Sequence, residues 1–363
     1  MRLLPDGTRT PVIDASVHIF FASNADMRAH LREPFNSRGI PDAEMDWYGA
    51  PGGEYAPGTR GPGKSYPGSD PDLVAQHLFA DRGVDVAVLH PMTRGILPDR
   101  HLTTAVLSAH NDMLVTRWLE HEVHGARFRG TLRVNPEDIT GALRDIARWG
   151  EHPRVVQLGI PLQSRELYGK PQFWPLWEAA AAAGLPVAMH IETGESIGLP
   201  PTPSGHTRTY EQYLGFMALN YVYHLMNMIA EGVFERFPGL RVVFADGAGD
   251  MLTPFSWRMD TFGRPHLEQT PWAPRMPSDY LPGHVHFVHG ALDGPGDTEF
   301  AGDWLEFTGK ADMVMFGSSY PHWHGADLDA LPSTLRPDQR DKLYWRNAAR
   351  LYGIDIPAPA AAR

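Results

Sequence analysis

The chain has 363 residues, no cysteine and a formal net charge of −11. These values exclude disulfide bonds and thiolate chemistry, and they argue against nucleic acid or an anionic membrane as a partner. No apolar run approaches the ~18 residues that a membrane span needs, and the first residues lack the apolar core of a secretory signal. We therefore expect a cytoplasmic protein that acts on a small molecule, with residues 1–363 in a single domain.

Predicted strands and helices alternate along the chain. The first strand, 12–20 (VIDASVHIF), alternates strictly, so Asp14, Ser16 and His18 are expected on one face. Further strands are predicted at 84–90, 128–135, 154–160, 185–190, 240–245, 284–289 and 313–316, with helices at 73–82, 101–122, 139–149, 171–183, 210–237, 250–262 and 337–352. Eight strands that alternate with helices predict an α/β fold, a parallel (β/α)8 TIM barrel. The alternative is an open doubly wound sheet, but no G-x-G-x-x-G turn follows an early strand.

Two segments are predicted as insertions in this barrel. The first, 21–70, is expected to lie outside the core, and its second half is rich in glycine and proline. It would serve as a lid, a binding loop or an assembly segment, since its aromatic residues could cover a ligand or a neighbouring subunit. The second, 192–210, is expected to lie over the barrel mouth.

Polar side chains recur where the predicted strands end, and in a barrel these ends meet at one mouth. Imidazoles have an ordinary pKa near ~6.5 and suit general acid–base catalysis. The candidate catalytic residues are His18, His190, Asp246, His289 and His322, of which Asp246 would orient an imidazole and His322 could equally shape a loop. The candidate substrate-binding residues are Ser16, Ser319, Arg133, His206 and Trp323. An arginine at this place could hold a carboxylate through two hydrogen bonds.

Several longer stretches carry a family resemblance. They read DASVH at 14–18, GLPVAMH at 184–190, EGVFERFPGLRVVFADGAG at 231–249, SSYPHW at 318–323 and NAARLYG at 347–353. They resemble family 2 of the amidohydrolase superfamily, the members related to aminocarboxymuconate semialdehyde decarboxylase, over nearly the whole chain from 12 to 353. The resemblance implies a metal-binding barrel. Such barrels hydrolyse C–N or C–C bonds, decarboxylate, or hydrate aromatic acids and related carbonyl compounds.

The chain departs from this family at two metal-ligand positions. The resemblance places the metal, usually zinc, between Ser16, His18, His190 and Ser319, where the family has oxygen or imidazole ligands at the first position and aspartate at the last. A neutral serine hydroxyl is a poor ligand, and it cannot accept a proton from water at neutral pH. We therefore expect no cofactor, with Ser16 and Ser319 as hydrogen-bond donors to a substrate oxygen. Alternatively, zinc or another divalent metal is held by His18 and His190 with Asp14 or Asp246.

Three functional hypotheses follow. The first is an enzyme that acts on a carbonyl- or carboxylate-bearing small molecule by metal-independent His/Asp acid–base catalysis, as a lyase, hydrolase, isomerase or cyclase. The second is a zinc-dependent hydrolase or decarboxylase with a rearranged ligand set. The third is an inactive barrel that acts as a binding subunit. The retained His18, His190 and Asp246 favour an enzyme. Related barrels often dimerise, so a homodimer is a further expectation.

Overall fold

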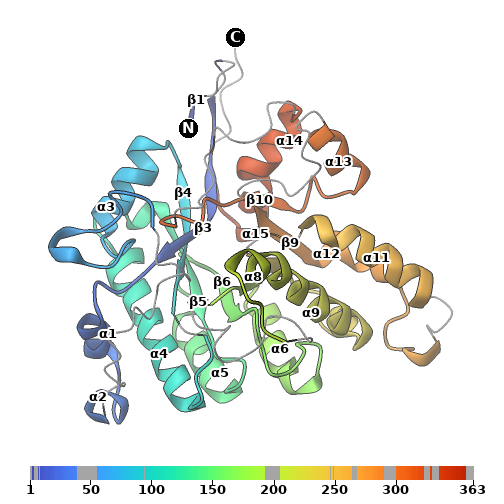
Figure 1. Cartoon of the computed structure of the whole chain (residues 1–363), viewed down its shortest axis with the longest axis horizontal. Coiled ribbons are helices and arrows are strands. Elements are labelled where there is room, and N and C mark those ends of the chain that lie inside the picture. The colour runs from blue at the N-terminus through green and yellow to red at the C-terminus, as the bar shows by residue number, and fades with distance from the viewer. Residues whose placement is uncertain are drawn as a thin grey trace.

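The computed structural model describes residues 2–3, 7, 9–38, 55–93, 95–192, 205–245, 247, 249–263, 268–289, 300–322, 328 and 335–356. Within them, eight parallel strands form a nearly closed barrel surrounded by helices, so the predicted fold is confirmed (Figure 1). The barrel strands are β3 (Ile13–Ile19), β4 (Val86–Pro91), β5 (Phe128–Arg133), β6 (Val155–Pro161), β7 (Val187–His190), β8 (Val242–Phe244), β9 (Val285–His289) and β10 (Val314–Phe316). A small antiparallel pair, β1 (Arg2–Leu3) and β2 (Arg9–Thr10), precedes them.

Helices follow most strands and pack against the outside of the barrel. Those of the first half are α1 (Asn24–His30), α2 (Phe35–Arg38), η1 (Pro62–Lys64), α3 (Pro71–Ala75), η2 (Gln76–Asp81), α4 (Arg100–Met113), η3 (Leu114–Leu119), η4 (Gly125–Arg127) and α5 (Ile139–Trp149). Those of the second half are η5 (Pro171–Phe173), α6 (Trp174–Ala182), α8 (Tyr210–Met217), α9 (Leu219–Ala230), α10 (Val233–Arg236), α11 (Gly249–Gly263), η7 (Pro277–Tyr280), α12 (Leu281–His284), α13 (Ala301–Phe307), α14 (Pro337–Asp341), η10 (Lys342–Arg346) and α15 (Asn347–Tyr352). None of these described helices is long and apolar enough to cross a membrane.

The predicted helix 210–237 is divided into α8, α9 and α10. One division lies at Gly232, whose φ of 71° is in the left-handed region that glycine adopts without strain. This backbone conformation cannot continue a right-handed helix, so α9 ends before it and α10 begins after it.

The barrel is closed by backbone hydrogen bonds between β3 and the residues that follow β10. The amide of His18 donates to the carbonyl of Tyr320 at 2.7 Å, and the amide of Ser319 donates to the carbonyl of Ser16 at 3.0 Å. We call this contact the seam. It brings two of the predicted site positions, 16 and 319, directly together.

A bulge in β3 interrupts the strict alternation of side-chain directions that the sequence predicts for this strand. The pairing of β3 with β4 shifts register between Asp14 and Val17. Before the bulge, Ile13 and Ala15 pack inside the barrel with residues such as Val88; after it, Val17 and Ile19 pack in the outer core. Because an extra residue reverses the side-chain direction, Asp14 does not share the face of Ser16 and His18, and the prediction that all three do is wrong.

The prediction that residues 21–70 lie outside the core is wrong for their first part. Phe21, Met27 and Leu31 are buried in the main hydrophobic core. Ser23 caps α1 by accepting a hydrogen bond from the amide of Asp26, and the Asp26 carboxylate binds Arg117 of η3 through two contacts of 2.7 and 2.8 Å. The cap and the ion pair fix α1 against the barrel helices.

Among the helices that the structure describes, π-helical turns occur in η2, η3 and η10. In each, an amide bonds to the carbonyl five residues before it: Arg82 to His77, Glu120 to Val115 and Asn347 to Lys342. Each turn therefore holds one residue more than an α-helical turn.

Replacing Gly317 by alanine tests the packing beside the seam. A Cβ at this position would lie 2.3 Å from Cγ1 of Val288 and 2.8 Å from Cβ of Ser16. We expect G317A to lower the free energy of unfolding by about 1–3 kcal/mol, measured by urea denaturation. The matched control is G215A in α8, where the added Cβ would have no atom within 4 Å beyond its chain neighbours and the backbone of its own helix. This substitution should raise the free energy of unfolding by about 0.4–1 kcal/mol. Equal effects of the two substitutions would contradict this packing.

Candidate active site

Two imidazoles from opposite sides of the barrel meet at the mouth. His18 ends the polar face of β3 and His190 ends β7, and their Nε2 atoms lie 2.8 Å apart. Nδ1 of His190 lies 2.5 Å from the carbonyl oxygen of Ile191. Because a carbonyl only accepts, the neutral His190 ring carries its proton on Nδ1. His18 therefore donates from Nε2 to the lone pair on His190 Nε2.

The two serines lie on the seam beside this pair. Oγ of Ser16 is 3.1 Å from Nε2 of His18. Ser319 has a φ of 53°, a conformation that is uncommon for residues other than glycine, asparagine and aspartate. The backbone at 319 thus has a conformation that aspartate adopts more readily than serine.

His322 joins the same group of rings. Its centroid lies 4.9 Å from that of His18, and Tyr55 stacks on it with centroids 5.2 Å apart and planes 28° apart. Tyr55 and His322 also form an isolated antiparallel bridge. Tyr55, a residue of the 21–70 segment, therefore covers one of the candidate imidazoles.

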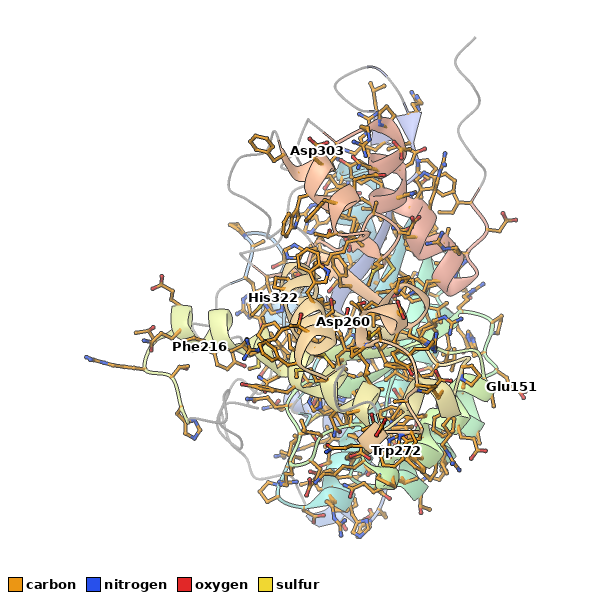
Figure 2. The ribbon with its side chains drawn as sticks, turned by 90° about the vertical axis from the view of Figure 1, so that its right-hand side faces the viewer. Glu151, Phe216, Asp260, Trp272, Asp303 and His322 are labelled. Carbon is orange, nitrogen blue, oxygen red and sulfur yellow. The ribbon has the colours of Figure 1, made fainter. Side chains whose placement is uncertain are left out.

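Figure 2 labels His322 and also Phe216 of α8, a helix that stands away from the barrel. The Phe216 side chain is 45% exposed.

A buried ion pair lies next to the imidazoles. Arg133 ends β5, and its guanidinium contacts both the carboxylate of Glu192 and Nε2 of His90. The side chains of Arg133 and Glu192 are each 0% exposed. Gly95 makes room for this arrangement, because a Cβ there would lie 2.5 Å from Cγ of Glu192. A charge removed from water is stable only with such a partner, so each of the two groups depends on the other.

His90 links the ion pair to the imidazole pair. Its ring stacks on His190 with centroids 4.1 Å apart and planes 27° apart. Burial first, and then the proximity of His190 and of the charged Arg133, lower the pKa of His90 well below its usual 6.5. His90 is therefore neutral at pH 7.

The remaining predicted residues are placed as follows. His289 ends β9, half-buried, and its carbonyl accepts from the amide of Gly317 at 3.4 Å. His206 is exposed. Asp14 is buried behind the seam, where its Oδ1 accepts from the amides of Ser16 and Ser318. Asp246 and Trp323 lie outside the described residues.

Neither Glu192 nor His90, the last residue of the predicted strand 84–90, was predicted as a site residue. The available signal for Glu192 was its spacing, two residues after His190 in the sequence HIE. Two other histidines, His110 and His224, have structural roles. Burial lowers the pKa of His110 to about 3 and of His224 to about 4, and each ring bonds to a backbone carbonyl.

The metal that the family resemblance implies does not fit the residues at its expected position. Ser16 and Ser319 are neutral, and the two Nε2 atoms that would face an ion bond to each other instead. A neighbouring group, His90, His190 and Glu192, does bring three ligand atoms within 4.8 Å of one another among the described residues. The charge of Glu192 is already balanced by Arg133, so an added divalent cation would find no net negative charge in this group.

Comparisons with known proteins agree with the fold. A family model described as "Amidohydrolase" matches residues 13–354. An amidohydrolase from Mycobacterium avium subsp. paratuberculosis K-10 superposes with a TM-score of 0.71 at 19% identity, over 95% of this chain and 100% of its own. A dihydroxybenzoic acid decarboxylase from Polaromonas sp. JS666, with bound manganese and 2-nitroresorcinol, gives 0.64 at 18%, over 95% and 97%. A 5-carboxyvanillate decarboxylase from Sphingomonas paucimobilis gives 0.64 at 21%, over 96% and 100%. Among curated proteins, no sequence matches significantly.

Replacing Glu192 by glutamine tests the buried ion pair. The substitution keeps the shape but leaves the buried charge of Arg133 without this carboxylate. We expect E192Q to lower the free energy of unfolding by about 3–5 kcal/mol in chemical denaturation. The exposed pair of Glu166 and Lys170 provides the control, because E166Q should cost no more than ~1 kcal/mol. A similar small loss in both variants would argue against the buried pair.

The stability of the protein should also depend on the protonation of Asp14. Burial raises the pKa of this carboxyl from 3.8 to about 6. The folded state thus binds the proton more tightly than the unfolded state, so the stabilisation is complete below pH ~4 and is lost as the pH rises through ~6. The stability difference between the native protein and D14N should change by about 2–3 kcal/mol across this window. Urea denaturation from pH 4 to pH 7.5 measures it, and a constant difference would refute the assignment.

Proposed function

Because the chain belongs to the amidohydrolase family, we propose that it is an enzyme in which His18 and His190 transfer protons to and from a carbonyl- or carboxylate-bearing small molecule. The observation that carries this proposal is the 2.8 Å hydrogen bond between their Nε2 atoms. It places a proton donor and a proton acceptor at one point of the mouth. No metal is required for this arrangement.

The tautomers assign a role to each ring. His18 holds a proton on Nε2 and can donate it as a general acid, and His190 offers a lone pair on Nε2 and can accept one as a general base. In a decarboxylation, the electron pair of the broken C–C bond forms a C–H bond with the donated proton as CO2 leaves. In a hydrolysis, the base removes a proton from the attacking water. Both reactions use the same two nitrogen atoms.

The proposed substrate class is an aromatic or unsaturated carboxylic acid. Two of the similar structures are decarboxylases, of dihydroxybenzoic acid and of 5-carboxyvanillate. Ser16 and Ser319 would donate hydrogen bonds to a substrate oxygen from the seam. We propose that Arg133 influences the substrate through the field of its pair with Glu192, because both side chains are fully buried.

Activity measurements on a panel of such acids test the proposal. Loss of substrate and release of CO2 would be followed before and after treatment with a chelator. We expect H18A and H190A each to lower kcat by about 10²–10⁴-fold, since each removes a proton carrier. The chelator should leave the native activity intact. Complete inactivation by the chelator with recovery on adding manganese would refute the metal-free mechanism. If H18A and H190A both retained full activity, the active site would not lie at the barrel mouth.

A metal-dependent hydrolase or decarboxylase is the second candidate. It is favoured by the His90, His190 and Glu192 group and by the manganese bound in a similar decarboxylase structure. To hold an ion, these three residues would have to release Arg133 from His90 and Glu192, and the ion would then supply a Lewis acid next to the substrate. Calorimetric titration with Mn²⁺ separates the two candidates. The metal-dependent mechanism requires Mn²⁺ binding by the native protein that E192Q abolishes. The metal-free mechanism requires the same weak titration in the native protein and in E192Q.

A further inference from the structure

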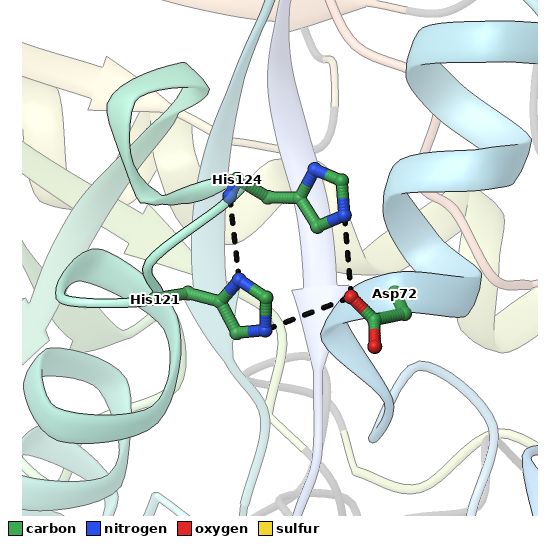
Figure 3. A group of neighbouring side chains, drawn as sticks. All are labelled: Asp72, His121 and His124. Carbon is green, nitrogen blue, oxygen red and sulfur yellow. Dashed lines mark hydrogen bonds and ion pairs between the residues drawn. The ribbon is translucent and has the colours of Figure 1, made fainter.

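A second group of metal-ligand side chains lies outside the imidazoles of the mouth. Asp72 of α3 faces His121 and His124, which lie in the turn between η3 and η4 (Figure 3). Oδ1 of Asp72 is 3.6 Å from Nε2 of His121 and 3.2 Å from Nε2 of His124. One carboxylate oxygen thus lies close to two imidazole nitrogens, and one ligand atom from each residue lies within 4.8 Å of the others.

The turn positions the two rings. The amide of Gly125 donates to the carbonyl of His121 at 2.9 Å, which closes a helical turn and puts His121 and His124 on the same side. Their rings are nearly parallel, 11° apart, with centroids separated by 5.2 Å. The side chains of the histidines are 24% and 26% exposed, and that of Asp72 is 75% exposed. The rings are therefore held in place while solvent keeps access to the carboxylate.

We propose that Asp72, His121 and His124 form a surface site for a divalent transition metal such as Zn²⁺. Two imidazoles and a carboxylate provide three protein ligands of the kind this metal takes, and water can complete a tetrahedral shell from the exposed side. The observed separations of 3.2 and 3.6 Å match the spacing of ligands that each lie about 2.0–2.2 Å from one ion. Imidazole ligands favour zinc and its neighbours over calcium or magnesium.

The electrostatics of this group differ from those of the mouth. No arginine or lysine is paired with Asp72 among the described ion pairs, so its charge can offset that of the metal, whereas the charge of Glu192 is balanced by Arg133. The amide of His124 donates to Nδ1 of His121 at 3.3 Å, which places the proton of the neutral His121 ring on Nε2. Coordination through Nε2 of His121 needs a lone pair on that atom, so metal binding would move the proton to Nδ1 and break this hydrogen bond.

The site would connect two parts of the chain. Asp72 begins α3, just after the 21–70 segment, and the histidines follow α4 and η3. An ion held by all three residues would fasten the start of α3 to the turn before β5. We therefore expect bound metal to raise the stability of the folded protein, whatever its effect on catalysis.

Zinc titration of the purified full-length protein tests the proposal. Calorimetry should show that H124A and D72N each weaken Zn²⁺ binding by at least about 10–100-fold, because loss of a direct ligand should cost no less than loss of a residue that merely orients one. The control H101A removes another exposed imidazole and should leave this binding event unchanged. Added Zn²⁺ should raise the Tm of the native protein and of H101A, and raise it less in H124A and D72N.

The same experiment can overturn the proposal. If D72N and H124A bind Zn²⁺ with the affinity and stoichiometry of the native protein, the group is only an ion pair between α3 and the turn. Equal losses in H101A and H124A would show nonspecific binding to exposed histidines. Circular dichroism of the metal-free variants verifies the fold, and surface substitutions of this kind usually change stability by no more than ~0.5 kcal/mol.

Discussion

The closure of the barrel is the constraint on which the rest of the structure depends. β3 and β10 are the ends of the sheet, and the backbone of Ser319 and Tyr320 joins them by bonding to Ser16 and His18. The residues that complete the fold are therefore also residues of the mouth. The bulge in β3 likewise belongs to both the fold and the mouth. It turns His18 inward beside His190, while Asp14 remains behind the seam. Fold closure and the position of the first imidazole cannot be separated.

Around this seam, the imidazoles of His18 and His190 lie beside one internally balanced ion pair. Arg133 and Glu192 neutralise each other, and His90 is kept neutral by burial between them and His190. The field at the mouth is then set by fixed protein groups instead of solvent. Fixed charges and dipoles of this kind can stabilise charge that develops during a reaction.

The barrel could be predicted from the sequence because eight apolar strands and the intervening helices leave a strong periodic signal. The convergence of His18 and His190 followed from that fold. The bulge could not be predicted, since VIDASVHIF alternates without interruption and only the pairing with β4 and the seam reveals the extra residue. The contact of Glu192 with Arg133 joins residues 59 positions apart, and Tyr55 reaches His322 from a glycine-rich segment. Both depend on tertiary packing that local sequence patterns do not encode.

The π-helical turns in η2, η3 and η10 affect how relatives of this chain should be aligned. A turn that closes with a bond to the fifth residue back holds one extra residue, so the apolar positions after it are displaced by one relative to a continuous α-helix. A homologue with plain α-helices at these places would align correctly only with a single-residue gap inside each helix. Conventional alignments put gaps in loops, and they would misassign the residues between such a turn and the next strand.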